Sequence, residues 1–410
     1  MQTKYDVIVA GGGFAGFAAA CAAAREGCNT LLVERNGFLG GAAGDALVLP
    51  FMRYSTRGDN RRVNAGLFLE VQQRLGMEEG SLYFREEELK IALEDLCAEY
   101  GVTLLYHTEI TGALVENGVL TALDAFCAGR HFKLYAPVYI DATGDANLAG
   151  MAGCGYELGD KGSCQPMTLC FRMANIDMEG FEKIRRSINP CYWEDQKKGL
   201  IRNPRENVLL FHTLIPGVLH FNTTRIIHVN PTDPEDLTRA EREGRQQVME
   251  MVAFLKRHFE CFAQAQLIMT AARAGVRESR LIHGEYTLTE DDVLSGRHFE
   301  SGIARSAYKI DIHNPGGTGT VLKNLPESVY YTIPFESCIP KEKKNLLVAG
   351  RCISATHAAQ SSFRIMPVCC CIGEGAGIGA ALFVKKGVRD LRMVDPGELR
   401  AILQKHGALC

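Results

Sequence analysis

The chain has 410 residues, of which 46% are hydrophobic and 23% are charged, and its formal net charge is −3 at pH 7. This length exceeds one ordinary domain, so two domains with ample core are expected. Lysine and arginine form no basic stripe, which argues against nucleic acid as a partner. We expect no apolar stretch of the ~18 residues that span a bilayer. Asp6 interrupts the N-terminal apolar run, so no signal peptide is predicted, and we expect a cytoplasmic protein without a membrane partner.

The chain begins with an apolar segment, residues 7–10, that predicts a buried parallel strand, and residues 17–25 predict a helix. Between them, Gly11, Gly13 and Gly16 have the Gly-x-Gly-x-x-Gly spacing of a dinucleotide-binding turn. The first glycine permits the tight turn, the second lets the backbone approach a pyrophosphate, and the third allows close packing. The pyrophosphate would lie on the free N–H groups of the helix N-terminus.

A second strand is predicted at 30–33, and Glu34 follows it, where a carboxylate can accept both hydroxyls of a ribose. Glycine spacing alone is weak evidence, but a strand before it, a helix after it and this acid together favour dinucleotide binding. The Gly-rich segment 38–44 is expected to be a loop against the cofactor, with Gly40 and Gly41 in contact.

The next segments extend the same α/β pattern. Helical periodicity starts at Arg85 and ends at Gly101, and further strands are predicted at 102–106, 113–115, 120–126, 132–135 and 138–140. The last of these strands ends in Asp141-Ala142-Thr143-Gly144-Asp145. Beyond residue 160 the pattern changes: strands are predicted at 169–173, 208–213, 220–229 and 308–312, with a long helix at 235–272.

Nucleotide-fold character returns near the C-terminus. Residues 345–351 predict a buried strand that closes on Gly350, and Pro367 opens a helix that is rich in small residues at 373–381. The sequence therefore predicts an α/β fold: a Rossmann-like domain split into 1–160 and 326–410, with an α+β domain of residues 161–325 inserted between its halves.

The cysteines and histidines predict no metal site. The fifteen cysteines include no Cys-x-x-Cys pair, and their odd number disfavours a disulfide framework. Burial as small apolar side chains in a reducing compartment is favoured instead. His212, His220 and His228 lie in strand-like sequence without a carboxylate or second histidine at helical spacing.

A nicotinamide dehydrogenase would complete its cofactor site within one contiguous domain, whereas here the closing strand lies more than three hundred residues after the glycine turn. The chain resembles the FAD-dependent oxidoreductases of the glutathione-reductase-like superfamily, and within them the group related to the flavin subunit of heterodisulfide reductase. The resemblance rests on the glycine turn with Glu34, Gly40-Gly41, residues 141–145, 311–313 and 349–354, and Ser362 to Pro367 with the helix that follows. It implies FAD as the cofactor and a Rossmann-like FAD-binding domain with an inserted substrate domain.

The resemblance also implies roles for single residues. Glu34 would hold the adenosine ribose, the backbone near Ile110 would meet the adenine, and 143–144 and 350–351 would flank the pyrophosphate and ribityl chain. The full predicted cofactor-binding set is Gly11, Gly13, Phe14, Ala15, Gly16, Glu34, Arg35, Gly40, Gly41, Ile110, Ala142, Thr143, Gly144, Gly350, Arg351, Pro367, Val368 and Cys369. The ferredoxin-like cysteine motifs of the full heterodisulfide reductase subunit are missing from this sequence, so no iron–sulfur relay is expected on it.

The predicted catalytic residues are His357, His313 and Arg364. Reduced flavin carries negative charge near N1, where the helix opened by Pro367 would present N–H groups and Arg364 a full charge; a salt bridge at the domain boundary is the alternative for Arg364. His357 and His313 are candidates for moving a proton near N5, and each could instead bind a loop carbonyl.

Two further pairs of residues have open roles. Arg305 and Tyr308 could anchor a substrate carboxylate, with a solvated surface favoured for Arg305. Core packing is favoured for Cys352 and Cys369.

Two functions compete. The first is an FAD enzyme that transfers a hydride between a small-molecule organic substrate and flavin N5 in an interdomain pocket, with an external electron carrier as a further partner. The second is an electron-transfer flavoprotein subunit that passes electrons to a protein partner. The size of the predicted inserted domain favours the enzyme. A flavoprotein with structural FAD and assembly into a homo-oligomer both stay open.

Overall fold

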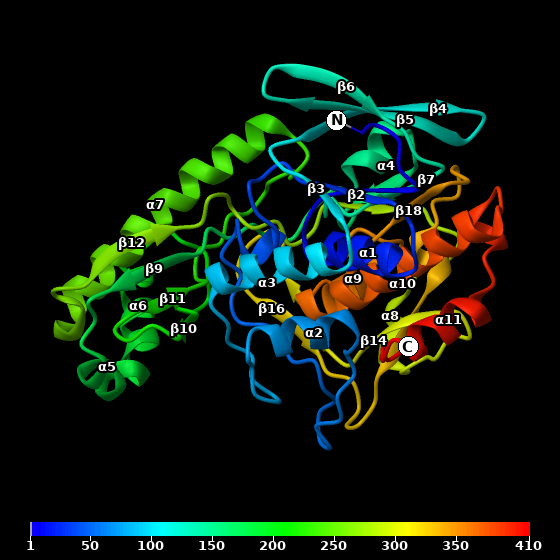
Figure 1. Cartoon of the computed structure of the whole chain (residues 1–410). Coiled ribbons are helices and arrows are strands. Elements are labelled where there is room, and N and C mark those ends of the chain that lie inside the picture. Colours follow the sequence, from blue (N-terminus) through cyan, green and yellow to red (C-terminus); the bar gives the residue numbers. More distant parts are fainter. Residues whose placement is uncertain (1) are drawn as a thin grey trace.

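A five-stranded parallel sheet lies at the centre of the computed structural model, which describes residues 2–410 (Figure 1). Its strand order is β18-β7-β1-β2-β3, and every neighbouring pair is parallel. The strands are β1 (Val7–Ala10), β2 (Thr30–Val33), β3 (Thr103–Leu105), β7 (Val138–Asp141) and β18 (Leu346–Val348). Because β1 lies between β2 and β7, the carboxyl end of β1 is a topological switch point, where open α/β sheets bind ligands. The predicted α/β class is confirmed.

The glycine turn and its helix lie where the sequence predicts them, with one shift. Helix α1 spans Phe14–Arg25, three residues earlier than predicted, because extended Gly13 is its N-cap and Phe17 N already donates to Gly13 O at 2.9 Å. Helix α3 (Glu86–Glu99), which leads into β3, packs against α1. Helix α2 (Leu67–Arg74) packs beside α3.

Helix α10 (Met366–Lys386) crosses α1 in the middle of the molecule. A Cβ on Gly373 would lie 2.0 Å from Ala15 O, and one on Gly377 would lie 2.3 Å from Ala19 O, so only glycine permits this approach. The expectation that no apolar stretch is long enough to span a bilayer is wrong, because α10 passes that test by length and composition. However, 94% of its most apolar window is buried in the protein, as in the core helix of a soluble fold.

A three-stranded antiparallel sheet covers one edge of the molecule. It consists of β4 (Glu109–Glu116), β5 (Val119–Cys127) and β6 (Arg130–Leu134), each close to a predicted short strand. The chain then passes through β7 into α4 (Asn147–Met151).

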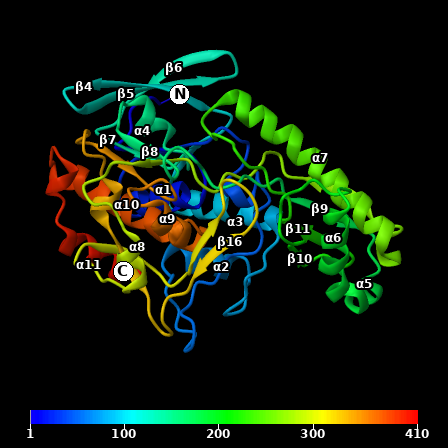
Figure 2. The same cartoon turned by 180° about the vertical axis from the view of Figure 1, so that it is seen from behind.

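A second part of the chain forms one end of the molecule in both views (Figures 1 and 2). Its antiparallel sheet has the order β10-β11-β9-β12 and is accompanied by three helices. Its elements are β9 (Phe171–Ala174), α5 (Met178–Ile184), α6 (Ile188–Lys197), β10 (Leu210–His212), β11 (Leu219–Phe221), α7 (Pro234–His258) and β12 (Gln266–Thr270).

Two predictions for this part are wrong in extent. The predicted helix at 235–272 ends at His258, because Phe259 adopts an extended conformation and residues 266–270 join the sheet as β12. The predicted strand at 220–229 is confined to β11, because the Thr224 hydroxyl bonds to the backbone N–H and C=O of Leu169 and draws the chain out of the ladder.

The remaining helices and strands belong again to the part of the protein around the parallel sheet. They are β8 (Tyr156–Leu158), β13 (Arg280–Ile282), α8 (Glu290–Leu294), β14 (Gly302–Ser306), β15 (Ile310–His313), β16 (Thr320–Lys323), β17 (Tyr331–Pro334), α9 (His357–Phe363) and α11 (Pro396–Lys405). The buried apolar side chains form two clusters, and Ile282 to Leu325 belong to the larger one around the parallel sheet. Apart from Leu47, the smaller cluster spans 167–274. The inserted domain of residues 161–325 stays a prediction. The packing of the buried apolar side chains favours a shorter inserted segment, residues 167–274.

Candidate active site

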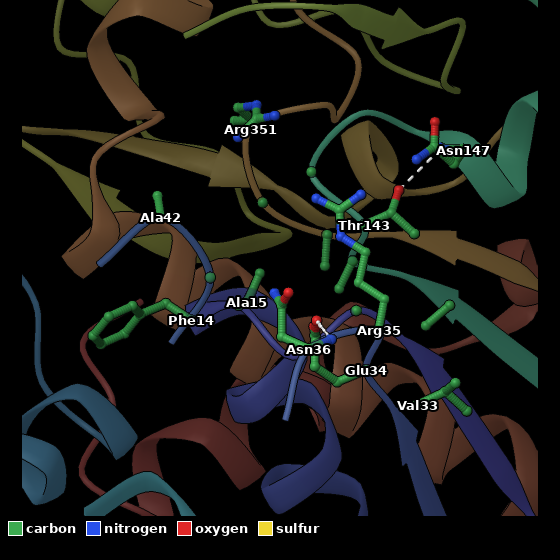
Figure 3. Close-up of a pocket in the computed structure, with 18 of the residues that line it drawn as sticks. Phe14, Ala15, Val33, Glu34, Arg35, Asn36, Ala42, Thr143, Asn147 and Arg351 are labelled. Carbon is green, nitrogen blue, oxygen red and sulfur yellow. Dashed lines mark hydrogen bonds between the residues drawn. The ribbon is translucent and has the colours of Figure 1, made fainter. Parts of the chain in front are cut away.

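A cleft of about 1140 Å³, including the solvent at its mouth, lies at the carboxyl ends of β1, β2 and β7 (Figure 3). Its lining begins with β2 and the glycine turn, passes the loops after β7 and β18, and reaches the start of α10. The cleft thus follows the topological switch point of the sheet. The predicted residues that line it are Gly11, Gly13, Phe14, Ala15, Glu34, Arg35, Gly40, Gly41, Ile110, Ala142, Thr143, Gly144, Gly350, Arg351, Arg364 and Cys369.

The three glycines of the turn have different steric constraints. A Cβ on Gly11, whose φ is +101°, would lie 2.5 Å from Ala142 O, and one on Gly16 would lie 1.8 Å from Gly11 O. Gly16 therefore packs inside the protein and does not line the cleft. A Cβ on Gly13 would find no protein atom nearer than Gly41 Cα at 3.8 Å. Gly13 thus presents bare backbone to the open cleft, as expected for close approach of a ligand.

Glu34 is buried beside this turn, and two backbone N–H groups hold its carboxylate. Oε2 accepts from Gly12 N at 2.6 Å, and Oε1 accepts from Asn36 N at 2.7 Å. These bonds fix the Glu34 carboxylate at the β2 end of the cleft. Arg35 is exposed, points toward Thr143 in Figure 3, and has no hydrogen-bond partner among residues 2–410.

A second glycine-rich segment closes on the first. Gly40 N donates to Gly12 O at 2.9 Å, and a Cβ on Gly41 would lie 2.8 Å from Gly13 Cα. The predicted loop contains one turn of 3₁₀ helix at Gly41–Ala43.

The loop after β7 is held by a buried carboxylate. Asp141 accepts from Thr143 N at 2.9 Å, Thr143 Oγ1 at 2.7 Å and Ala149 N at 2.8 Å. Burial raises the pKa of Asp141 in spite of these bonds. Thr143 Oγ1 also accepts from Asn147 N at 2.9 Å, and this bond joins the loop to α4 (Figure 3).

The loop after β18 brings a paired arginine to the cleft. Arg351 Nη2 lies 2.5 Å from Asp145 Oδ1, and Arg351 Nε is buried without a hydrogen-bond partner within residues 2–410. Burial acts to raise the pKa of Asp145, but Arg351 and Arg273 outweigh it, and the pKa is lowered. Asp145 is therefore a carboxylate at neutral pH.

The start of α10 forms the far end of the cleft. Met366 and Cys369 line the cleft, but Pro367 and Val368 do not. Arg364, in the connection between α9 and α10, lines the cleft and donates to Asp311 O at 3.0 Å. Among the described residues no carboxylate lies within 4.0 Å of its guanidinium, so the salt bridge considered for Arg364 is absent there. Burial lowers the pKa of Arg364.

The two predicted catalytic histidines lie outside the cleft lining and have different partners. His357 Nδ1 lies 2.7 Å from Oε1 of the fully buried Glu278. His313 Nδ1 lies 2.9 Å from Arg225 Nη2, and because a guanidinium can only donate, this nitrogen is an acceptor. Burial and then the neighbouring arginines lower the pKa of His313, so it is neutral. Among the described residues, neither histidine side chain bonds a loop carbonyl.

The two candidates for anchoring a substrate carboxylate also have partners within the protein. Arg305 donates to the carbonyl oxygen of Cys410, and Tyr308 donates to Asp311 Oδ2 at 3.1 Å.

Several cleft residues are not evident from the sequence. Arg273 Nε donates to Asp45 Oδ2 at 2.6 Å, and both residues line the cleft although 228 positions separate them. Asn36, Thr108 and Asn147 also line it. These residues belong to no motif, and only the folding of distant segments onto the sheet edge brings them together.

The described part of the chain contains no group of three His, Cys, Asp or Glu side chains that could hold a metal ion. All fifteen cysteines are free thiols, and thirteen of them are buried, as the sequence predicts. Burial raises the pKa of Cys369 to about 12 and that of Cys352 well above its usual value, which suits apolar packing rather than thiolate chemistry.

The donor set of the cleft fits FAD. A carboxylate lies at one end, a glycine turn with free N–H groups follows, and guanidinium groups of Arg35 and Arg351 lie along the path. Bare backbone at Gly13 leaves room that a side chain would fill. These groups match a ribose, a pyrophosphate and an extended flavin chain.

Comparison with known proteins identifies the family. The family model described as "FAD dependent oxidoreductase" matches residues 6–403. A digeranylgeranylglycerophospholipid reductase from Methanocella arvoryzae is 24% identical over 163 residues, and one from Methanoculleus marisnigri is 29% identical over 171 residues. Each alignment covers 37% of this chain and 42% of the relative, so the chain spans less than half the length of these relatives.

A solved structure shows the same fold. The geranylgeranyl bacteriochlorophyll reductase-like protein from Thermoplasma acidophilum superposes with a TM-score of 0.51 at 15% identity, over 98% of this chain and 84% of that protein. Together with the match of the family model along nearly the whole chain, this fold identifies the protein as a member of the FAD-dependent oxidoreductase family, with FAD as its cofactor.

Proposed function

We propose that this protein transfers a hydride between a small organic substrate and FAD, with the substrate bound where the inserted segment meets the nucleotide-binding part. The observation that carries this proposal is the hydrogen-bonded pair of His357 and Glu278. Glu278 acts on Arg364, and Arg364 lines the end of the cleft. The finer resemblance to the flavin subunit of heterodisulfide reductase, the cytoplasmic location and an external electron carrier stay parts of the proposal.

The cofactor residues act by binding and by charge. When bound, FAD supplies a flavin that accepts or donates a hydride at N5. The N-terminus of α10 and the guanidinium of Arg364 lie at the same end of the cleft. A helix terminus stabilises negative charge by about 0.3–1 kcal/mol, and up to about 2 kcal/mol when partly buried. Arg364 adds a full positive charge, which favours negative charge at this end.

His357 is placed to move a proton. Glu278 is held in turn by Gln165 N, which donates to its Oε2 at 3.1 Å. A carboxylate at Nδ1 keeps the ring proton on that nitrogen and leaves Nε2 as the acceptor. Nε2 has no partner among the described residues, and the side chain is 15% exposed. His357 can therefore take a proton from a substrate O–H or N–H group during oxidation, and return it in the reverse direction.

The first experiment tests the cofactor. The purified protein should be yellow with flavin absorbance, and a colourless protein that cannot be reconstituted with FAD would refute the proposal. The second test follows anaerobic bleaching of the oxidised flavin with a panel of small metabolites. Bleaching by a metabolite supports the hydride-transfer enzyme, and exchange of electrons with a protein partner alone would support the electron-transfer flavoprotein instead.

A matched pair of variants tests the proton step. His357→Gln should retain FAD and lower the rate of flavin bleaching by about 10²- to 10⁴-fold, the usual contribution of a general acid–base group. Glu278→Gln keeps the shape of the positioning residue but removes its charge, so it should change the pH profile of that rate. His131→Gln, on the exposed surface, is the control. Unchanged rates in both site variants would remove His357 from the mechanism.

A further inference from the structure

Four arginines meet beside His313, and one of them, Arg364, lines the cleft. Arg205 and Arg225 come from the segment of the smaller hydrophobic cluster, Arg277 follows that segment, and Arg364 precedes α10. All four act on His313, since each contributes to lowering its pKa. Arg225 Nη2 touches His313 Nδ1 at 2.9 Å, and Arg364 Nη1 donates to Arg277 O at 3.4 Å. The cluster therefore joins the two parts of the chain.

The carboxylates near this cluster are already engaged. Glu206 is shared by Arg225 at 3.2 Å and Arg205 at 3.9 Å. Glu278 bonds His357, and Asp311 accepts from the hydroxyl of Tyr308 at 3.1 Å. Asp311 and Glu278 also act on Arg364 and offset part of the effect of its burial on its pKa. Three carboxylates thus lie near four arginines, and the cluster keeps a net positive charge.

Arg277 and Arg364 are the two without a carboxylate partner among the described residues. Arg277 donates to Pro166 O at 2.6 Å and lies 3.5 Å from Asn222 Oδ1, and Arg364 donates to backbone carbonyls. Burial of an unpaired cation is unfavourable unless an opposite charge compensates it. Burial, and then the charges of Arg205 and Arg364, lower the pKa of Arg277.

Two further donors of the cluster have no acceptor. Arg205 Nη1 and Arg225 Nε are buried atoms without a hydrogen-bond partner in residues 2–410, and these residues are only 4% and 1% exposed. Buried donors are paired in the great majority of native structures. The described residues therefore supply fewer acceptors than this cluster has donors, in addition to leaving its charge unbalanced.

The cluster is connected to the proposed catalytic residues. Gln360 Nε2 donates to Arg277 O at 2.9 Å, and Gln165 accepts from His313 N at 3.0 Å while its own N–H holds Glu278. A group bound by Arg277 and Arg364 would therefore sit next to the His357–Glu278 pair and to the lining of the cleft.

We propose that the substrate carries an oxyanion, either a carboxylate or a phosphate ester, which binds to Arg277 and Arg364 and orients the reacting carbon toward the flavin. This inference rests on the proposed function, and it names the substrate class. Arginine suits the role because its planar fork donates two parallel hydrogen bonds to an oxyanion. Arg205 and Arg225 are positioning residues: both add positive charge, and Arg225 holds His313 through Nδ1.

The test measures anion binding by the FAD-loaded protein, without turnover. Sodium succinate and glycerol 3-phosphate are titrated separately at constant ionic strength, with calorimetry and the flavin absorbance as readouts. The wild-type protein should bind at least one of them saturably at one site per chain. Arg277→Gln should weaken that binding at least tenfold, because a hydrogen bond to a charged group is lost. Arg245→Gln is the control, since Arg245 is 56% exposed and its one ion pair within residues 2–410 is with Glu241.

Each outcome decides a different point. Preference for succinate or for glycerol 3-phosphate assigns the oxyanion. Failure of FAD-loaded wild type to bind either anion, or equal binding by Arg277→Gln, overturns the inference while the proposed function stands. Failure to retain FAD overturns the proposed function itself. Should Arg277→Gln not fold, phenylglyoxal labelling of the wild type replaces it, and the bound anion must then protect Arg277 from modification.

Discussion

A Cβ atom on Gly16 would lie 1.8 Å from the carbonyl oxygen of Gly11, so the first turn of α1 packs backbone against backbone on the turn before it. At Gly13, between them, the nearest described atom to the same position, apart from Gly13 and its chain neighbours, is Gly41 Cα at 3.8 Å. The glycine motif thus combines two physical demands. Gly16 is needed for the close backbone packing of the fold, and Gly13 leaves space for the ligand.

This difference predicts opposite results for two substitutions. Gly13→Val should fold with nearly wild-type stability but lose FAD, because its side chain projects into space left by the protein. Gly16→Ala should lower the free energy of unfolding by about 1–3 kcal/mol or more, since overpacking against backbone cannot relax. Urea unfolding of the apoproteins and flavin content measure the two effects separately. Normal FAD retention by Gly13→Val would contradict the assignment of the turn.

The packing of α10 on α1 gives a second prediction. Alanine in place of glycine within a helix normally adds about 1 kcal/mol of stability. At Gly373 a Cβ would meet Ala15 O at 2.0 Å, and backbone cannot move aside, so Gly373→Ala should destabilise the protein. In α4, the nearest atom to a Cβ on Gly150 is Arg280 Nε at 3.6 Å, so Gly150→Ala should be neutral or stabilising. In thermal unfolding, Gly373→Ala should lower the Tm, whereas Gly150→Ala should leave the Tm unchanged or raise it.

His220 makes stability depend on pH. It is fully buried on β11, both ring nitrogens lack partners within residues 2–410, and burial lowers its pKa from 6.5 to about 3. The unfolded chain binds a proton below pH 6.5 whereas the folded protein does not, so stability falls as pH drops from 6.5 toward 3. At pH 4.5 this single group lowers the free energy of unfolding by roughly 2–3 kcal/mol.

Removing that group should flatten the acid side of the stability curve. Between pH 7.5 and pH 4.5 the free energy of unfolding of His220→Leu should fall by about 2 kcal/mol less than that of the wild type. Denaturant unfolding at both pH values measures this difference. His131→Gln, at an exposed position, should follow the wild-type curve. Parallel acid dependence of wild type and His220→Leu would show that His220 does not carry this effect.

Thiol reactivity provides a further prediction. With the pKa of Cys369 raised to about 12, only about one thiol in ten thousand is ionised at pH 8. Cys352 is fully buried. Iodoacetamide should therefore label the half-buried Cys127 and Cys191 of the native protein first, and Cys352 and Cys369 only after unfolding. Rapid labelling of Cys369 in the native protein, followed by peptide mass spectrometry, would instead indicate a reactive cysteine near the flavin.

Local pattern predicted the nucleotide fold well. The strands at 7–10 and 30–33 have the predicted bounds, because an all-apolar run followed by glycine favours a buried parallel strand whatever surrounds it. The inserted part was predicted less well. The end of α7 and the short β11 depend on Phe259 and Thr224, whose conformation and hydrogen bonds are set by distant partners.

The sequence by itself determined the strand–turn–helix at Gly11, the acid at Glu34 and the small-residue helix after Pro367, because each depends on local backbone geometry and periodicity. The tertiary structure alone decided which charges meet. Glu278 reaches His357 across 79 positions, and Arg277 meets Arg364 across 87. Such pairs leave no local pattern, since burial and hydrogen bonding between remote segments depend on how the sheet edges and α9 pack. The cofactor, together with His357 and Arg364, is therefore visible in the sequence, whereas their partners Glu278 and Arg277 are visible only in the fold.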